Sequence, residues 1–73
     1  MSIHSFREFD SVVVLARFGE PDGAMFPTGT CAAIVDLGAD YALVEIVEQE
    51  GIVHGPYDVA LTDLRLIEHA RAA

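Results

Sequence analysis

A chain of 73 residues is suited to one small domain, and its net charge of −8 comes from twelve acidic and four basic side chains. Binding to a nucleic-acid backbone or to an anionic membrane requires clustered Lys and Arg side chains, so we expect neither partner. The acidity fits a basic protein partner, or it only keeps a hydrophobic domain soluble.

The cysteine content and the apolar runs indicate a cellular compartment. Cys31 is the one cysteine, and its place in an apolar run predicts a buried, reduced thiol of the kind found in the cytosol. The chain starts without the basic and apolar segments of a signal peptide. Its longest apolar runs, 12–16 and 31–35, fall far short of the roughly 20 residues that a membrane helix needs. We therefore expect a cytoplasmic protein.

The first third of the chain predicts a strand between two irregular segments. Residues 1–9 are a lead-in, in which Phe6 and Phe9 are expected to pack across the mouth of a small barrel. Residues 10–16 are rich in β-branched side chains and predict a strand covered on both faces, because apolar side chains occupy successive positions. Residues 17–29 contain three glycines and two prolines, which exclude a regular element and predict a long loop.

The apolar side chains of this loop have two interpretations. Phe18, Met25 and Phe26 either fold back over the core as a lid, which we favour, or are offered to a partner. Loops of this kind between strands are the usual place of binding in a small barrel.

Residues 30–48 predict a hairpin at the centre of the fold, because two β-type runs flank a Gly/Asp turn. Alternation in the second run places three residues on the core face: Ala42, Val44 and Ile46. Leu43 and Val47 then point outward, as do Val13 and Leu15 in the first strand. These apolar side chains on an outward face suggest an interface.

The last third predicts two more strands. Residues 52–59 form one, with Gly55-Pro56 marking an edge or a bulge. Residues 61–64 form a single 3₁₀ turn, residues 65–68 the last strand, and residues 69–73 a frayed tail or helical turn. The fold class is therefore all-β: one small, partly open SH3-like barrel of about five strands over residues 1–73, with its core in 6–68.

Four short motifs carry a resemblance: Asp10-x-Val12-Val13-Val14-Leu15, Thr28-Gly29-Thr30-Cys31-Ala32-Ala33-Ile34-Val35-Asp36, Tyr41-Ala42-Leu43-Val44-Glu45-Ile46 and Asp63-Leu64-Arg65. Over residues 6–68 the chain resembles a family of short bacterial proteins that is catalogued as a domain of unknown function. The resemblance implies a single SH3-like barrel and brings no activity, cofactor or site residues. A glycine of the family pattern falls on Ala32, where we expect ordinary strand geometry.

The residues with chemical potential each have a simpler explanation. The carboxylates fit a solvated acidic surface better than the two walls of a glycosidase cleft. Cys31 has no neighbouring base that would make it a nucleophile. His54, near Tyr57 and Asp58, fits a half-exposed edge-strand histidine, and a metal site with His4 lacks a ligand spacing. We predict no catalytic, metal or cofactor residues.

Two functions from different classes are left. The favoured one is a protein-interaction module that acts through a homodimer, a protein partner or both, since a core this small gains from a second chain. Its contact residues would be Val13, Leu15, Phe18, Met25, Phe26, Leu43 and Val47. The alternative is a small-molecule or metal-binding, possibly enzymatic, domain with a site around His54, Tyr57 and Asp58.

Overall fold

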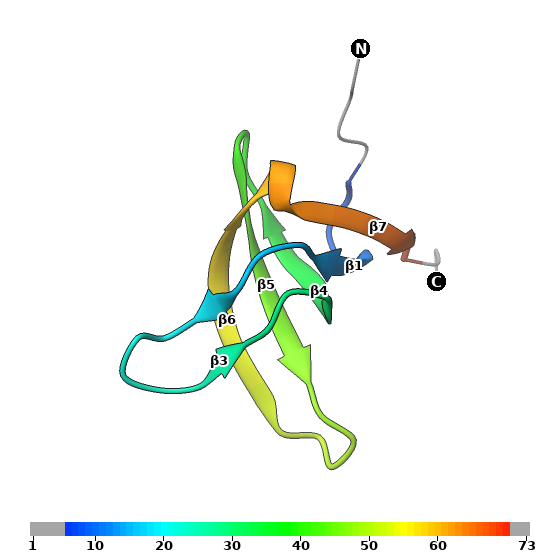
Figure 1. Cartoon of the computed structure of the whole chain (residues 1–73). Helices are drawn as coiled ribbons and strands as arrows, with labels where there is room; N and C mark the ends of the chain where they lie inside the picture. Colours follow the sequence, from blue (N-terminus) through cyan, green and yellow to red (C-terminus); the bar gives the residue numbers. More distant parts are fainter. Residues whose placement is uncertain (1–5, 71–73) are drawn as a thin grey trace.

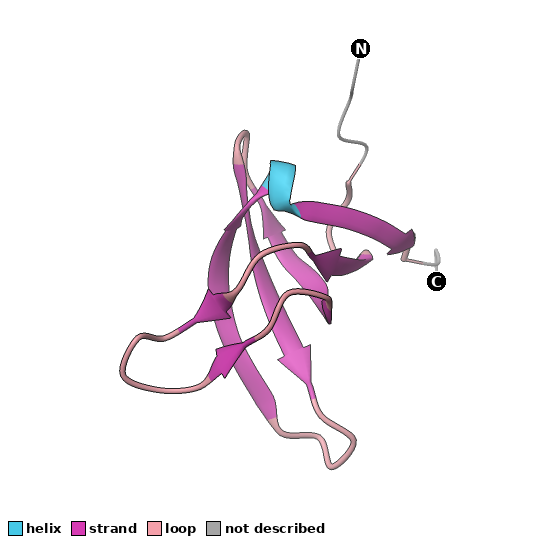
Figure 2. Cartoon of the chain, in the orientation of Figure 1, coloured by secondary structure: helices cyan, strands magenta, loops and turns pink. Residues whose placement is uncertain are grey.

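The computed structural model describes residues 6–70, which fold into strands and one short 3₁₀ turn (Figures 1 and 2). The strands are β1 (Ser11–Val14), β2 (Phe18–Gly19), β3 (Met25–Phe26), β4 (Thr30–Leu37), β5 (Tyr41–Val47), β6 (Val53–Ala60) and β7 (Leu64–Glu68). The turn, η1 (Leu61–Asp63), lies directly before β7. The all-β prediction is confirmed. Residues 6–70 contain no helix that is long and apolar enough to cross a membrane.

The main sheet has five antiparallel strands in the order β6-β5-β4-β1-β7, and β2 and β3 form a separate two-stranded ribbon. The end strands β6 and β7 are not paired with each other, so the sheet is open and not a closed barrel. Figure 1 shows it as a strongly twisted sheet with the turn of the long β5–β6 hairpin at one end and both ends of the described chain away from that turn.

The β4–β5 hairpin confirms the prediction for the centre of the sequence. The two strands pair antiparallel, with Ile34 opposite Val44. Ala42, Val44 and Ile46 are buried as the alternation predicts. They join a core from every strand of the main sheet, from β2 and from η1: Val12, Val14, Phe18, Ala32, Ile34, Ala42, Val44, Ile46, Val59, Leu61 and Leu64.

The segment 17–29, predicted to be a long loop, contains the β2–β3 ribbon. The prediction that no regular element forms there was therefore wrong. Phe18 pairs with Phe26, and their rings stack with centroids 5.4 Å apart. Gly19 makes the ribbon possible: it has a φ of 134°, and a Cβ there would collide with the carbonyl oxygen of Ala24. Glycine was expected to prevent a regular element in this segment, but Gly19 is the residue that allows the two short strands to approach each other.

Two other burial predictions were wrong. Cys31 is exposed: because Ala32 and Ile34 point into the core, period-two alternation turns Cys31 outward. Phe9 is 65% exposed and has a positive φ of 71°, so its side chain leaves the core at the turn before β1. Phe6 does pack against the core as a partly buried residue.

The edge position of β6 is confirmed, because β6 pairs only with β5 in the main sheet. A register shift opposite Gly55 interrupts this pairing between Val44 and Ile46. Gly55 has a φ of 114°, which favours glycine. The shift places His54 and Tyr57 on the same side of β6, although they are three positions apart.

Asp10 fixes both ends of the described chain, so the prediction of a frayed tail was wrong for residues 69 and 70; residues 71–73 lie outside the described part. The buried Asp10 carboxylate accepts hydrogen bonds from the Arg7 N–H (2.8 Å) and the Ala70 N–H (2.8 Å), and His69 Nδ1 lies 2.9 Å away. Burial by itself raises the pKa of Asp10. The bonds from Ala70, Arg7 and His69 outweigh it and hold this pKa below its ordinary value of 3.8.

Candidate functional site

The outer face of the sheet consists of those residues of β1, β4 and β5 that point away from the core. Its members alternate with buried residues along each strand: Ser11, Val13, Cys31, Ala33, Val35, Tyr41, Leu43, Glu45 and Val47. The pairings Val13–Cys31 and Ala33–Glu45 tie the three strands together on this face. Alternation therefore places these side chains together on one face, opposite the core.

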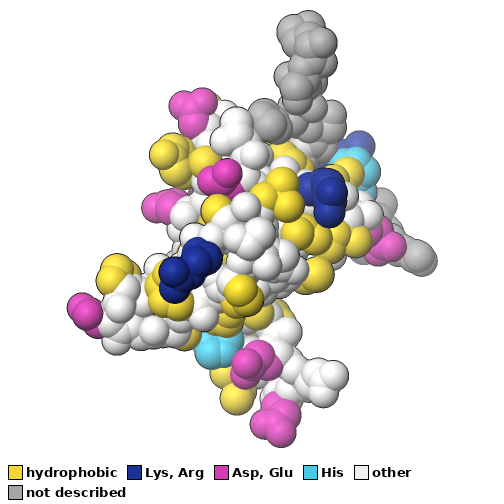
Figure 3. Space-filling view, viewed as in Figure 1, with side chains coloured by type: hydrophobic (Ala, Val, Ile, Leu, Met, Phe, Trp, Pro, Cys, Tyr) yellow, Lys and Arg dark blue, Asp and Glu magenta, His cyan; other side chains and the backbone are white. Residues whose placement is uncertain are grey.

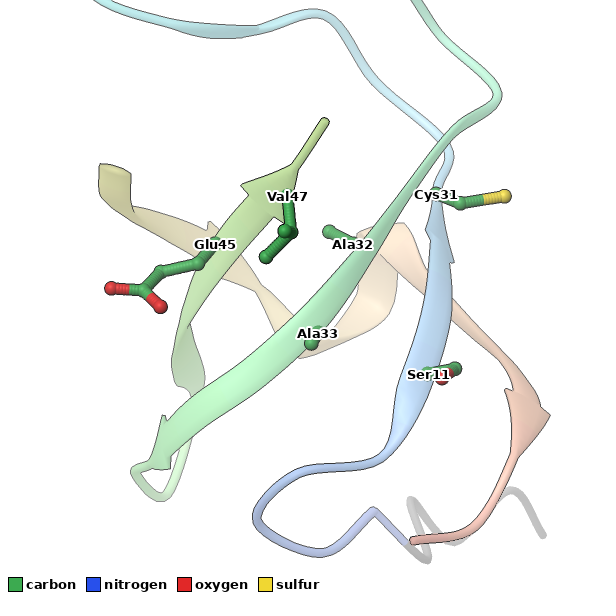
Figure 4. Close-up of a pocket in the computed structure, with 6 residues that line it drawn as sticks. All are labelled: Ser11, Cys31, Ala32, Ala33, Glu45 and Val47. Atoms are coloured by element: carbon green, nitrogen blue, oxygen red, sulfur yellow. The ribbon is translucent and has the colours of Figure 1, made fainter. Parts of the chain in front are cut away.

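A hollow of about 200 Å³ lies in this face, lined by Ser11, Cys31, Ala32, Ala33, Glu45 and Val47. Figure 4 shows that Ser11 on β1 and Ala33 on β4 carry short side chains, whereas Glu45 and Val47 on the neighbouring strand β5 carry longer ones. Small residues in the middle of a sheet leave a depression that larger side chains would fill. The hollow is therefore a partly apolar recess, and Glu45 lines it with its carboxylate directed away from Ser11 and Cys31 (Figure 4).

The end of the β5–β6 hairpin adjoins the hollow through Val47. Val47 lies opposite Val53 in the sheet, and these two valines are 62% and 50% exposed. The hairpin turn closes through two backbone hydrogen bonds, from Gly51 N–H to Glu48 O and from Glu48 N–H to Ile52 O. A second, wider concavity of about 470 Å³ lies here, lined by Val47, Glu48, Gln49 and Glu50.

Acidic side chains surround this hairpin end. Glu45, Glu48 and Glu50 line the two concavities that share Val47. The cationic residues of the described chain are Arg7, Arg17 and Arg65, none of which belongs to β5, β6 or their turn. In Figure 3 the lower end of the molecule shows yellow, magenta and cyan side chains and no dark blue.

The structure brings together only some of the predicted contact residues. Val13 lies opposite Cys31 in the sheet, and Val47 lines the same hollow as Cys31. Leu43 is half-buried farther along β5, and Leu15 is exposed just after β1. On the ribbon, Met25 is exposed, Phe26 is half-buried and Phe18 is in the core, so Phe18 has little surface to offer.

Sequence reasoning missed Val53 and the exposure of Cys31. Val53 could have been found by extending the alternation of β5 across the turn, since it faces the predicted outward residue Val47. Ile52, also half-exposed, precedes β6 and adds to the apolar content of the hairpin end.

The alternative site is only partly assembled. The rings of His54 and Tyr57 lie 5.3 and 5.9 Å from that of Phe26. Asp58 is exposed and pairs with Leu43, which places it on the other side of β6 from the half-buried Tyr57. Within residues 6–70 no group of three His, Cys, Asp or Glu side chains could hold a metal ion, and His4 lies outside the described residues.

His54 has an incompletely satisfied ring. Its Nε2 atom is buried and makes no hydrogen bond to any described residue, although Glu48 Oε2 lies 3.4 Å away. That distance is at the long end for a hydrogen bond, and the Glu48 side chain is half-exposed, so the contact is loose.

Comparison of the chain with protein-family models, with curated proteins and with solved structures finds no match.

Proposed function

We propose that this domain is a protein-interaction module that works through the outer face of its sheet and the end of its β5–β6 hairpin. Its partner is a second copy of the chain, a different protein or both. The observation that carries the proposal is the exposed Val47–Val53 pair beside the hollow at Cys31. Both side chains lie outside the hydrophobic core.

The energetics favour a use for this surface. Covering two half-exposed valines contributes about 1 kcal/mol each from the apolar area removed from water. Their place on paired strands means that little conformational entropy is lost when a partner binds, which is the usual advantage of a preorganised surface.

We further propose that the sheet and ribbon together form an open variant of the SH3-like barrel, as the family resemblance implies, in a cytoplasmic protein. Three features support the fold assignment: the β2–β3 ribbon inserted between β1 and β4, the turn η1 before the last strand, and the pairing of β7 with β1. A small barrel of this type commonly binds through the loops and strands at one side.

The test is the solution mass by light scattering over a dilution series, together with binding of an apolar dye. Wild-type protein is compared with Val47→Asp and with a matched control, Ile67→Asp, because Ile67 is as exposed as Val53 but lies on β7. We expect a dimer or a dye signal that Val47→Asp removes and Ile67→Asp retains. A monomer that binds no dye contradicts a self-associating or strongly apolar surface.

A small-molecule or metal site at His54 and Tyr57, with or without Asp58, is the second candidate. The buried, unbonded His54 Nε2 favours it, whereas the packing of Tyr57 against Phe18 and Phe26 occupies the space a ligand would need. A screen of divalent metals and metabolites by thermal unfolding tests it, because a specific ligand raises the melting temperature. A shift that disappears in His54→Ala would support this candidate.

A further inference from the structure

The proposed function leaves the chemistry of the partner open, and the outer face restricts it. We infer that the partner is a basic, amphipathic polypeptide segment that places apolar side chains along one row of the sheet and Lys or Arg side chains beside Glu45, Glu48 and Glu50. This inference rests on the proposed function and names the class of partner that the surface fits.

The row, called the outer row below, crosses four strands: Val13, Cys31, Val47 and Val53. Val13 lies opposite Cys31 and Val47 opposite Val53, while Cys31 and Val47 line the same hollow. All four members are therefore neighbours on one face. An extended or helical segment that lies across the strands would contact them in sequence.

The hollow at Cys31 is small for a free metabolite. Its volume of about 200 Å³ is below the roughly 300 Å³ at which small-molecule pockets begin, and the wider concavity beside it is lined by residues of the hairpin end alone. The hollow is open to the outer face and bordered by Val47 and Cys31, so an aliphatic or aromatic side chain of a partner could enter it. Such anchors in shallow recesses supply most of the energy of protein interfaces.

The charges decide between a foreign partner and a second copy. Three carboxylates surround Val47, and one cation, Arg65, lies at the other end of the outer row opposite Val13. Glu68 lies beside it on β7, opposite Ser11. A second copy that docked through its own outer row would bring either its three carboxylates or the nearly neutral Arg65–Glu68 end to this place. A basic segment alone neutralises the acidic hairpin end, and charge complementarity of this kind selects partners.

A selection from a random-peptide display library, with the wild-type domain as target, tests the inference. We expect enriched peptides in which Lys or Arg alternates with apolar residues. Their binding, measured with synthetic peptides, should weaken about tenfold in Glu48→Gln/Glu50→Gln and should fall with added salt, because both changes remove attraction to the hairpin end.

Two matched variants separate this surface from general acidity. Glu20→Gln/Asp22→Asn removes the same charge from the exposed β2–β3 turn, and Ile67→Asp adds a charge to an exposed apolar site outside the outer row. Neither should change binding by more than about twofold, whereas Val47→Asp should abolish it. Equal losses in both acidic double variants would overturn the inference, since the peptides would then follow net charge alone.

The remaining outcomes distinguish the inference from the function on which it rests. Enriched peptides without basic residues that still require Val47 overturn the inference and leave the interaction module standing. The same holds for a dimer that Val47→Asp dissociates, because the occupant is then a second copy. A monomer that selects no peptide overturns both.

Discussion

The two ends of the sheet each hold a histidine close to a carboxylate, and the two pairs differ in every other respect. At the end where the described chain starts and stops, the Asp10 side chain is 0% exposed and accepts two backbone N–H groups in addition to His69. At the hairpin end, the Glu48 side chain is 51% exposed and lies 3.4 Å from His54 without a hydrogen bond.

This difference indicates that the Asp10–His69 pair stabilises the fold and that the Glu48–His54 pair does not. A buried carboxylate with all its bonds satisfied holds separate segments together, and losing one partner leaves others unpaired. An exposed carboxylate beside a histidine is screened by water and contributes little. The hairpin end is therefore free to exchange its contacts with a partner, and the Asp10 end is not.

The largest expected effect is that of Asp10→Ala. It leaves the Arg7 and Ala70 N–H groups and His69 without their acceptor, so we expect a loss of about 3 kcal/mol in the free energy of unfolding. Asp10→Asn keeps part of the acceptor and should lose about half as much. Urea unfolding measures both. Asp22→Ala, at an exposed turn, is the control, and an Asp10→Ala variant as stable as this control would contradict the contrast.

The second largest effect is a loss of stability at low pH that depends on Asp10. Since the folded pKa of Asp10 lies below its unfolded value, this group stabilises the fold fully above that unfolded value. The contribution is lost as the pH falls through the folded pKa. We expect stability to fall below about pH 4, with up to about 1.4 kcal/mol per pH unit due to this one proton. Asp10→Asn should show a shallower slope in urea titrations between about pH 2 and pH 5.

A smaller effect is expected for His69→Ala. This change removes one of the three groups that meet the Asp10 carboxylate and leaves both backbone bonds in place. The loss should be about 1 kcal/mol, the value of a typical hydrogen bond, because the His69 side chain is partly exposed. Hydrogen exchange of the Ala70 amide provides a local readout, and we expect it to become faster. Unchanged exchange would show that His69 does not help to hold this segment.

The smallest effect is expected for Glu48→Gln. Because this carboxylate is half-exposed and makes no hydrogen bond to His54, the free energy of unfolding should change by less than about 0.5 kcal/mol. A loss comparable to that of Asp10→Asn would remove the distinction between the two pairs. The urea midpoint of this variant, measured beside Glu50→Gln, decides it.

Strand periodicity allowed much of the sheet to be predicted. The buried set Ala42, Val44 and Ile46 followed from alternation, since one face of β5 meets the core and the other meets solvent. Alternation was not applied to residues 31–35, because an unbroken apolar run resembles a strand buried on both faces. That is why the exposure of Cys31 was missed, and with it the hollow.

Long-range contacts were beyond sequence reasoning. The bond between Asp10 and His69 joins positions 59 apart, and no local pattern indicates which side chain a buried aspartate will meet. The β2–β3 ribbon was missed because glycine and proline are typical of loops, although Gly19 here permits a close strand pair. The apolar outward face of β5 was foreseen in Val47, whereas its opposite member Val53 was missed because the alternation was not extended across the hairpin turn.

The hydrogen bonds of Asp10 also indicate where the domain can be circularised or fused to another protein. Because one carboxylate bonds to the amides of both Arg7 and Ala70, a short linker could join these two positions into a circle with little loop-closure entropy. New ends could then be opened in the β2–β3 turn. In Figure 1 the ends of the described chain lie away from the β5–β6 turn, so a fusion partner attached at either position would leave the acidic hairpin end accessible.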